Sequence, residues 1–201
     1  YDLAMIAREA LKNEKFREIV STKTKAIKLS DGNVSRVFRN HNRLLFEYDD
    51  IIGVKTGFTK KCGRTLVSAA ERDGVTVICV TLCDGDDWRD HRRLLSAGLD
   101  LYEKVTLCES GEMESTVHVC GGKKVSIEVF CKDRLAVTLL KNHGEVKSVV
   151  SLPPFVYAGF EAGRELGFVT FYVDGEPVGR VSLAAAEGCA VKQRKKNIFG
   201  K

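Results

Sequence analysis

The stretch Ile51-Ile52-Gly53-Val54-Lys55-Thr56-Gly57-Phe58-Thr59 is followed by Thr65-Leu66-Val67-Ser68-Ala69-Ala70 and then by Val75-Thr76-Val77-Ile78-Cys79-Val80-Thr81-Leu82. Each run is apolar and short, as strands are, and Arg72-Asp73-Gly74 between the last two runs is a turn signal. Strands joined by so short a turn pair antiparallel, and the third run is apolar enough to lie inside a sheet. The first half of the chain therefore predicts an antiparallel sheet.

Helical patterns flank these strands on both sides. Leu3, Ile6, Ala7, Ala10 and Leu11 recur at helical spacing, and Phe16, Ile19 and Val20 continue the pattern as a second short piece. Asp2 is predicted to cap the first helix. Asp86 or Asp87 is predicted to cap a long helix whose buried face is formed by Trp88, His91, Leu95, Leu99 and Tyr102.

Further strands are predicted around this centre. Residues 26–29 and 34–38 read as two strands joined by the turn signal Ser30-Asp31-Gly32-Asn33. After residue 104 short strand candidates alternate with turns such as Gly121-Gly122 and Asp174-Gly175; they are residues 115–119, 124–130, 135–140, 146–150, 168–173 and 177–183. We therefore predict an α+β domain over residues 1–105 and a small all-β domain over residues 106–201.

Composition limits the class of protein. The 201 residues are 44% hydrophobic and 29% charged, which is typical of a globular protein, and no apolar run approaches the roughly 18 residues of a membrane span. The net charge of +5 is dispersed except near the end, where Lys192, Arg194, Lys195 and Lys196 cluster. Such a distribution argues against a nucleic-acid reader. The terminal cluster is either a solvated tail or a contact with an anionic membrane surface.

Seven cysteines are present, at positions 62, 79, 83, 108, 120, 131 and 189. Their spacings do not match structural zinc sites. An odd number fits a disulfide framework poorly, and several cysteines lie within apolar runs, so we interpret them as mostly free core thiols. His41 and His91 are each isolated in sequence and are interpreted as packed or surface histidines rather than metal ligands or bases.

The motif with chemical content is Lys55-Thr56-Gly57, which by itself is a short and weakly specific pattern. Its surroundings add specificity: Asn40-His41-Asn42-Arg43-Leu44-Leu45 precedes it, Cys62-Gly63-Arg64-Thr65-Leu66-Val67-Ser68-Ala69-Ala70 follows it, and Arg92-Arg93-Leu94-Leu95 with Gly98 lies in the next helix. Over nearly its full length the chain resembles the D-alanyl-D-alanine carboxypeptidases, low-molecular-mass penicillin-binding proteins of the penicillin-recognising serine peptidases. Residues 156–173 and the Asp174-Gly175 turn resemble the C-terminal β-domain of that family.

The resemblance implies a fold, a reaction and a site. The fold would be part of the penicillin-binding, β-lactamase-like antiparallel sheet with flanking helices, followed by the β-domain. The parent enzyme would remove the terminal D-alanine from peptidoglycan stem peptides through a serine ester, would bind β-lactams and would need no metal or cofactor. Lys55 would lie near both the nucleophile and the substrate carboxylate, Thr56 would donate to that carboxylate, Gly57 would let the peptide approach, and the Phe58 N–H would be an oxyanion donor.

The 201 residues lack the family's nucleophile. No serine is followed by Lys at the third position, and no Ser-x-Asn occurs. Tyr1-Asp2 matches a position shortly after the family's Ser-x-Asn. We therefore expect the isolated chain to be inactive, because nothing in it can form or activate the acyl-enzyme. We also expect it to bind the absent half or to self-associate, since apolar surface would be exposed.

Two other functions were weighed. A non-catalytic β-rich scaffold or binding module at the membrane or cell wall is the main alternative. A β-lactamase shares Lys-Thr-Gly, but such enzymes have no all-β C-terminal domain and the Asn-x-Asn-x-Leu-Leu run points away from them. In the favoured interpretation the parent protein is exported to the outer face of the cytoplasmic membrane.

Overall fold

The structure is a computed structural model that describes residues 1–28 and 35–193. Contacts divide the chain into two compact units, residues 1–103 and 104–201. Unit 1 combines helices with strands, whereas the described part of unit 2 is built from strands. This combination confirms the predicted α+β class. That the parts 1–105 and 106–201 are separate domains stays a prediction.

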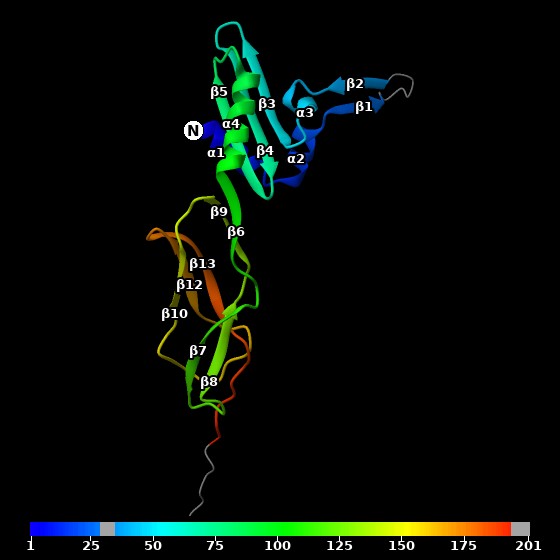
Figure 1. Ribbon diagram of the computed structural model, residues 1–201. Helices are drawn as coiled ribbons and strands as arrows, with labels where there is room; N and C mark the ends of the chain where they lie inside the picture. Colours follow the sequence, from blue (N-terminus) through cyan, green and yellow to red (C-terminus); the bar gives the residue numbers. More distant parts are fainter. Residues whose placement is uncertain (29–34, 194–201) are drawn as a thin grey trace, which may run out of the picture. The chain divides into compact units, whose positions relative to one another are not determined.

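The centre of unit 1 is a three-stranded antiparallel sheet (Figure 1). Its strands are β3 (Ile51–Thr59), β4 (Gly63–Arg72) and β5 (Val75–Leu82), in the order β3-β4-β5. The turn between β4 and β5 contains Asp73 and Gly74 with φ of 52° and 77°. Two consecutive left-handed residues are the signature of the two-residue hairpin turn that an Asp-Gly pair favours. The predicted hairpin is therefore confirmed.

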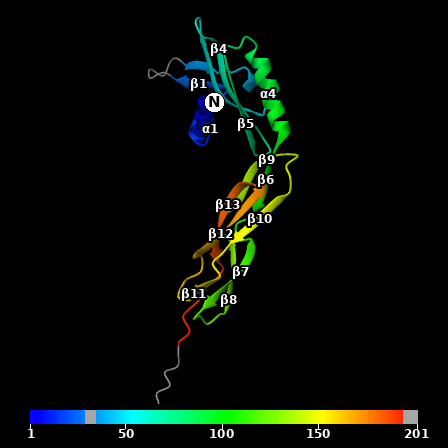
Figure 2. The same ribbon diagram turned by 90° about the vertical axis from the view of Figure 1, so that its left-hand side faces the viewer.

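Four helices accompany this sheet: α1 (Asp2–Ala10), α2 (Glu14–Ser21), α3 (Leu44–Glu47) and α4 (Asp87–Leu101). Figures 1 and 2 place α4 on one face of the sheet and α1 on the other. The buried core consists of Leu44, Leu45, Ile51, Leu66, Ala70, Val75, Cys79, Leu95 and Leu99. Apolar side chains from α3, α4 and all three strands thus share one core, which holds β3 in place.

Helix ends differ from the predictions. Tyr1, and not Asp2, is the N-cap of α1, and it makes no side-chain cap bond. Asp86 is the N-cap of α4, as one of the two predicted alternatives, but its carboxylate makes no cap bond and pairs with Arg89 instead. The carboxylate of Asp87 binds Arg64 on β4. Tyr102 was assigned to the buried helix face, yet it ends α4 and begins a strand with 40% of its surface exposed.

Two strands of unit 1 form a separate ribbon. β1 (Thr24–Lys28) pairs antiparallel with β2 (Ser35–Arg39), with Thr24 opposite Arg39 and Lys28 opposite Ser35. These bounds differ by one or two residues from the predicted strands. The turn predicted at Ser30-Asp31-Gly32-Asn33 lies outside the described residues, as do Arg194, Lys195 and Lys196 of the terminal basic cluster.

Unit 2 has a six-stranded sheet in the order β10-β12-β13-β8-β7-β11 and a two-stranded sheet of β6 and β9. The strands are β6 (Tyr102–Cys108), β7 (Met113–Cys120), β8 (Ser126–Cys131), β9 (Leu135–Leu140), β10 (Val146–Ser151), β11 (Phe155–Tyr157), β12 (Glu165–Val173) and β13 (Glu176–Ala185). Six of these eight strands were predicted with bounds that differ by at most three residues, whereas β6 and β11 were not predicted. The predicted Asp174-Gly175 turn joins β12 to β13, with φ of 51° and 85°.

Cysteines divide by position. Cys79, Cys108, Cys131 and Cys189 are buried, while Cys62, Cys83 and Cys120 are exposed, and all seven are free thiols. The interpretation as mostly free core thiols is confirmed, with Cys62, Cys83 and Cys120 as the exposed exceptions. Among residues 1–28 and 35–193, no cluster of three or more His, Cys, Asp or Glu side chains is arranged to hold a metal ion. The helices in the same ranges are too short or too polar to cross a bilayer.

Candidate active site

The sequence motif lies on an edge strand. Within the described residues β3 pairs with β4 alone, so the other edge of β3 has no strand beside it. Lys55 is opposite Val67, Thr56 is opposite Leu66, and Gly57 is opposite Thr65. An edge strand with free backbone groups can accept an extended peptide as an additional strand. The motif thus occupies a position where a peptide could bind.

A surface pocket of about 490 Å³ contains the motif. It is lined by His41, Lys55, Thr56, Gly57, Phe58, Arg64, Thr65, Asp87 and Trp88. The structure therefore brings the four predicted site residues, Lys55 to Phe58, together on one wall. The Lys55 ammonium is exposed and donates to the Thr56 carbonyl oxygen, and Phe58 is 69% exposed. The pocket is open to solvent on the side of these residues.

Gly57 is required by the strand beside it. A Cβ atom at this position would overlap Oγ1 of Thr65, because it would come closer than real Cβ contacts do. Thr65 is the cross-strand partner of Gly57 and also lines the pocket. Gly57 therefore lets the Thr65 hydroxyl stand next to the motif, a constraint that the tripeptide alone did not reveal.

Arg64 is a second cation in the pocket. Its Nε donates to Oδ2 of Asp87 at 3.2 Å, and its Nη2 donates to Oδ1 of the same carboxylate, so the pair is bidentate. The side chain of Asp87 is 3% exposed and that of Arg64 is 39% exposed. The guanidinium also lies 5.4 Å from the centre of the Trp88 ring. Two neighbours from the start of α4 thus fix the direction of this charge.

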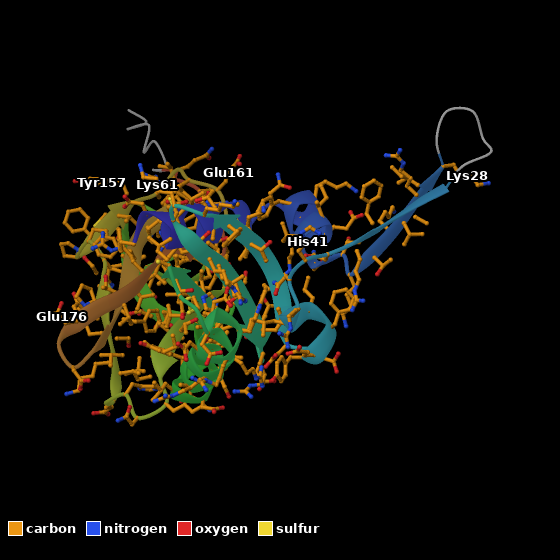
Figure 3. All side chains as sticks on the ribbon, turned by 90° about the horizontal axis from the view of Figure 1, so that it is seen from above. Lys28, His41, Lys61, Tyr157, Glu161 and Glu176 are labelled. Atoms are coloured by element: carbon orange, nitrogen blue, oxygen red, sulfur yellow. The ribbon has the colours of Figure 1, made fainter. Side chains whose placement is uncertain are left out.

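Five further pocket residues were not predicted from the sequence motif: His41, Arg64, Thr65, Asp87 and Trp88. Arg64 and Thr65 come from β4, while Asp87 and Trp88 begin α4. His41, labelled in Figure 3, is exposed on the segment between β2 and α3. Arg64 and Thr65 belong to the sequence that flanks the motif, but their spacing could not indicate that they lie next to Asp87 and Trp88, 23 positions later in the chain.

A buried histidine lies on α4, one turn after Asp87 and outside the lining of the pocket. Nδ1 of His91 is 2.5 Å from Oγ of Ser68, and Nε2 is 3.0 Å from Oγ1 of Thr81. His91 and Ser68 are both fully buried. Burial lowers the pKa of His91, against the opposing effect of nearby carboxylates. The Ser68–His91 contact resembles a nucleophile–base pair, but a substrate cannot reach it, so its role is structural and His91 is a packed histidine as predicted.

Comparisons with known proteins agree with this arrangement. A family model described as D-alanyl-D-alanine carboxypeptidase matches residues 1–85, and one described as penicillin-binding protein 5, C-terminal domain, matches residues 102–190. The D-alanyl-D-alanine carboxypeptidase DacF of Bacillus subtilis is 26% identical over 196 residues, which cover 93% of this chain and 49% of DacF. The D-alanyl-D-alanine carboxypeptidase of Streptomyces sp. (strain K15) is 40% identical over 84 residues, covering 40% of this chain and 29% of that protein.

Solved structures show the same fold. Penicillin-binding protein 5 from Haemophilus influenzae superposes with a TM-score of 0.68 at 23% identity, covering 94% of this chain and 56% of that one. The peptidoglycan synthesis regulatory factor PBP3 from Streptococcus pneumoniae also gives 0.68, at 18% identity, covering 96% of this chain and 56% of that one. These likenesses confirm the predicted partial penicillin-binding fold.

The two family models follow each other along the chain, and the chain spans about half the length of DacF and less of the Streptomyces enzyme. Together the two matches cover most of the chain and support a fragment of a D-alanyl-D-alanine carboxypeptidase that carries the Lys-Thr-Gly strand and the C-terminal β-domain.

Proposed function

We propose that this chain is the carboxylate-recognition part of a serine-type D-Ala-D-Ala carboxypeptidase that trims peptidoglycan stem peptides. The observation that carries the proposal is the pocket in which Lys55, Thr56, Gly57 and Phe58 follow one another along the free edge of β3, with Arg64 opposite Phe58. A peptide that ends in a free carboxylate matches two cations and a hydroxyl at a strand edge.

Each residue has a role in this proposal. The substrate lies antiparallel to β3, Gly57 permits its approach, and the Thr56 hydroxyl donates to its terminal carboxylate. Lys55 supplies a positive charge close to that carboxylate and to the attacking group. The Phe58 N–H is one of two oxyanion donors, each worth about 3 kcal/mol of transition-state stabilisation. Arg64, held by Asp87, adds a second cation on the carboxylate side of the pocket.

The reaction itself needs groups that this stretch of sequence does not contain. A serine hydroxyl must attack the penultimate carbonyl, D-alanine must leave with a proton, and water must then hydrolyse the ester. No Ser-x-x-Lys or Ser-x-Asn occurs among the 201 residues, and Ser68 is buried against His91. We therefore propose that the chain binds the substrate but forms no acyl-enzyme unless a polypeptide with those motifs completes the site.

The test separates binding from chemistry. A fluorescent penicillin is incubated with the chain alone and with a polypeptide that carries the family's Ser-x-x-Lys and Ser-x-Asn motifs. We expect no labelled band from the chain alone and a labelled complementing polypeptide in the mixture. A labelled band from the chain alone would contradict the assignment of the missing nucleophile.

Carboxylate recognition is tested on the chain alone. Diacetyl-L-Lys-D-Ala-D-Ala and its C-terminal amide are titrated and the backbone amide shifts of β3 are followed by NMR. We expect the free acid to bind at least about tenfold more tightly than the amide, because charge-assisted hydrogen bonds are the stronger ones. Lys55→Met with Thr56→Val should abolish this preference, whereas Lys60→Met should keep it. Equal affinity for acid and amide would refute the proposed recognition.

Unit 2 supports a second role, attachment to a surface. Val125, Tyr157 and Val191 are 79%, 72% and 58% exposed, and the chain around Val191 bonds to the β7–β8 loop, since Lys192 N–H donates to the Gly121 carbonyl. Together with the basic residues that follow Val191 in the sequence, these exposed apolar side chains suit an anionic bilayer.

We propose that the parent enzyme is exported and held at the outer face of the cytoplasmic membrane, where its substrate lies. Flotation with phosphatidylglycerol vesicles, but not phosphatidylcholine vesicles, is the expected result; equal behaviour with both would count against it.

A further inference from the structure

The ribbon of unit 1 concentrates positive charge. We define the basic ribbon as residues 23–28 and 35–39, which is β1, β2 and the preceding lysine. Figure 1 shows it pointing away from the three-stranded sheet, and in Figure 3 the labelled Lys28 lies at its far end. Its basic side chains are Lys23, Lys25, Lys28, Arg36 and Arg39, and within these residues there is no Asp or Glu. The chain has 32 basic against 27 acidic residues, so this short element holds as many charges as the whole excess.

A groove lies at the base of the ribbon, against α2. Its volume is about 370 Å³, and it is lined by Lys15, Glu18, Ile19, Thr22, Lys25, Phe38, Arg39 and Asn40. None of these residues lines the candidate active site. The volume is that of a small-ligand site or of a few residues of an extended chain.

The groove is both apolar and cationic. Ile19 and Phe38 leave 62% and 54% of their surfaces exposed, although large apolar side chains usually find cover. Three cations line the groove against one carboxylate, and that carboxylate, on Glu18, already accepts from Lys15 at 2.7 Å. Lys25 lies directly opposite Phe38 in the ribbon. A ligand would therefore meet positive charge beside exposed apolar surface.

The groove is held in shape by contacts that do not involve a ligand. The Asn40 side-chain amide donates to the carbonyls of Val20 and Thr22, at 3.2 and 3.1 Å, and so joins the ribbon to the end of α2. The Arg39 guanidinium lies 4.3 Å from the centre of the Phe46 ring. Such contacts reduce the cost of ordering these side chains when a partner binds.

We propose that the ribbon groove is a docking site for an extended acidic segment of a partner protein. An apolar side chain of the segment packs between Ile19 and Phe38, and carboxylates on either side of it pair with Lys25 and Arg39. A phosphate polymer would use the charges but not the apolar floor. An extended peptide with acidic residues two positions before and two positions after an apolar residue presents all three on one face and so uses both, which is why the observations favour it.

The test uses the intact chain and a defined probe, followed by fluorescence anisotropy. The probe is an eight-residue fluorescein-labelled peptide in which Glu occupies the positions two before and two after a single Val, and Ser fills the other positions. We expect saturable binding that weakens as salt is raised. Lys25→Glu with Arg39→Glu should weaken it at least about tenfold. The matched control, Lys60→Glu with Lys61→Glu, reverses two exposed charges on the β3–β4 turn and should leave affinity within about twofold. Far-ultraviolet circular dichroism checks that each variant is folded.

The apolar contact is tested separately with Phe38→Ser, which keeps every charge. We expect this substitution to lower the affinity for the peptide by about five- to tenfold, because one buried aromatic contact is lost. Binding weaker than roughly 1 mM, or an unchanged affinity for Phe38→Ser together with equal displacement by inorganic polyphosphate, would overturn the proposal. The second result would identify a general polyanion surface. Penicillin labelling does not enter these measurements, so they stand apart from the proposed enzymatic function.

Discussion

Asp87 illustrates what happens at the scale of single residues. Its sequence context, the start of a long amphipathic helix, favours a capping role. In the structure its carboxylate instead binds Arg64, which lies 23 positions earlier in the chain and belongs to a strand. Sequence rules for helix caps consider only residues within about one turn of the helix end. They therefore favour a capping role and cannot identify a partner on another element. The same limit kept Thr65 and Trp88 out of the predicted site.

Removing the partner of Arg64 should cost stability. We expect Asp87→Asn to lower the free energy of unfolding by about 1–2 kcal/mol, since the carboxylate is buried but the guanidinium is partly screened by water. Asp86→Asn removes the exposed partner of Arg89 and should change the free energy of unfolding by less than about 0.5 kcal/mol. Urea unfolding followed by Trp88 fluorescence measures both. Equal effects for the two variants would show that the Arg64–Asp87 pair is no stronger than a surface pair.

His91 should make unit 1 sensitive to mild acid. Burial keeps the pKa of His91 lower in the folded state than its ordinary value of about 6.5. The unfolded chain therefore binds a proton first as the pH falls, and stability declines below pH about 6.5 by up to about 1.4 kcal/mol per pH unit. The decline ends once the pH passes the lowered folded-state pKa. Carboxylates with lowered pKa values, such as Glu71, act only at more acidic pH.

This pH dependence is measured by urea unfolding between pH 7.5 and 5. His91→Gln, which cannot titrate, should have a lower free energy of unfolding at every pH, and this free energy should not change over the range. A wild-type free energy of unfolding that stays constant between pH 6.5 and 5 would contradict the role given to His91.

Secondary-structure elements could be predicted where their pattern was strong. The runs that became β3, β4 and β5, and the periodic face of α4, were recognised because burial on one or both faces imposes a repeat on the sequence. The short elements α3 and β11 were missed, since four and three residues are too few to show a repeat. β6 was missed because it follows α4 at Tyr102 without any turn residue between them.

Packing of α4 on the sheet depends on Gly98. A Cβ atom there would lie 2.8 Å from Cγ1 of Val77, on β5. Alanine is the better helix former by about 1 kcal/mol, yet we expect Gly98→Ala to lower the free energy of unfolding by about 1–3 kcal/mol because of this overlap. Gly85→Ala, with no atom within 4 Å of the new Cβ, is the control and should be near neutral.

A double-mutant cycle identifies the cause. Val77→Ala removes the obstructing methyl groups, so Gly98→Ala should cost less in that background than in the wild type. Equal costs in the two backgrounds would mean that the overlap with Val77 is not responsible.

For the whole molecule, the order of the parts followed from composition: a mixed half, then a half of short strands and turns. Lys55 to Phe58 lie together in one pocket because four consecutive residues on a strand edge need no tertiary information to stay together, and their role in substrate binding stays a prediction. Which cysteines are buried did not follow. Cys62 and Cys83 lie at strand ends, where a one-residue shift decides between core and solvent.

The thiols provide a test that covers both units. We expect Cys62, Cys83 and Cys120 to react rapidly with a disulfide reagent in the native protein, and the four buried cysteines to react only on unfolding. Burial raises the pKa of Cys79 and of Cys131, which removes the reactive thiolate as well as access. Mass spectrometry of tryptic peptides after timed labelling identifies each site. Rapid native labelling of Cys131 or Cys189 would contradict the core of unit 2.

The basic ribbon also determines how the protein should behave on charged media. The sequence has an isoelectric point of about 8.8, and two short segments carry five basic residues each without an acidic one, namely the basic ribbon and residues 192–201. Retention on a cation exchanger should therefore depend on these two segments more than on the average charge. Neutralising the five cations of the ribbon should bring the isoelectric point close to 7 and weaken retention at neutral pH, whereas neutralising five lysines that lie in opposite-charge pairs should shift the isoelectric point similarly but weaken retention less.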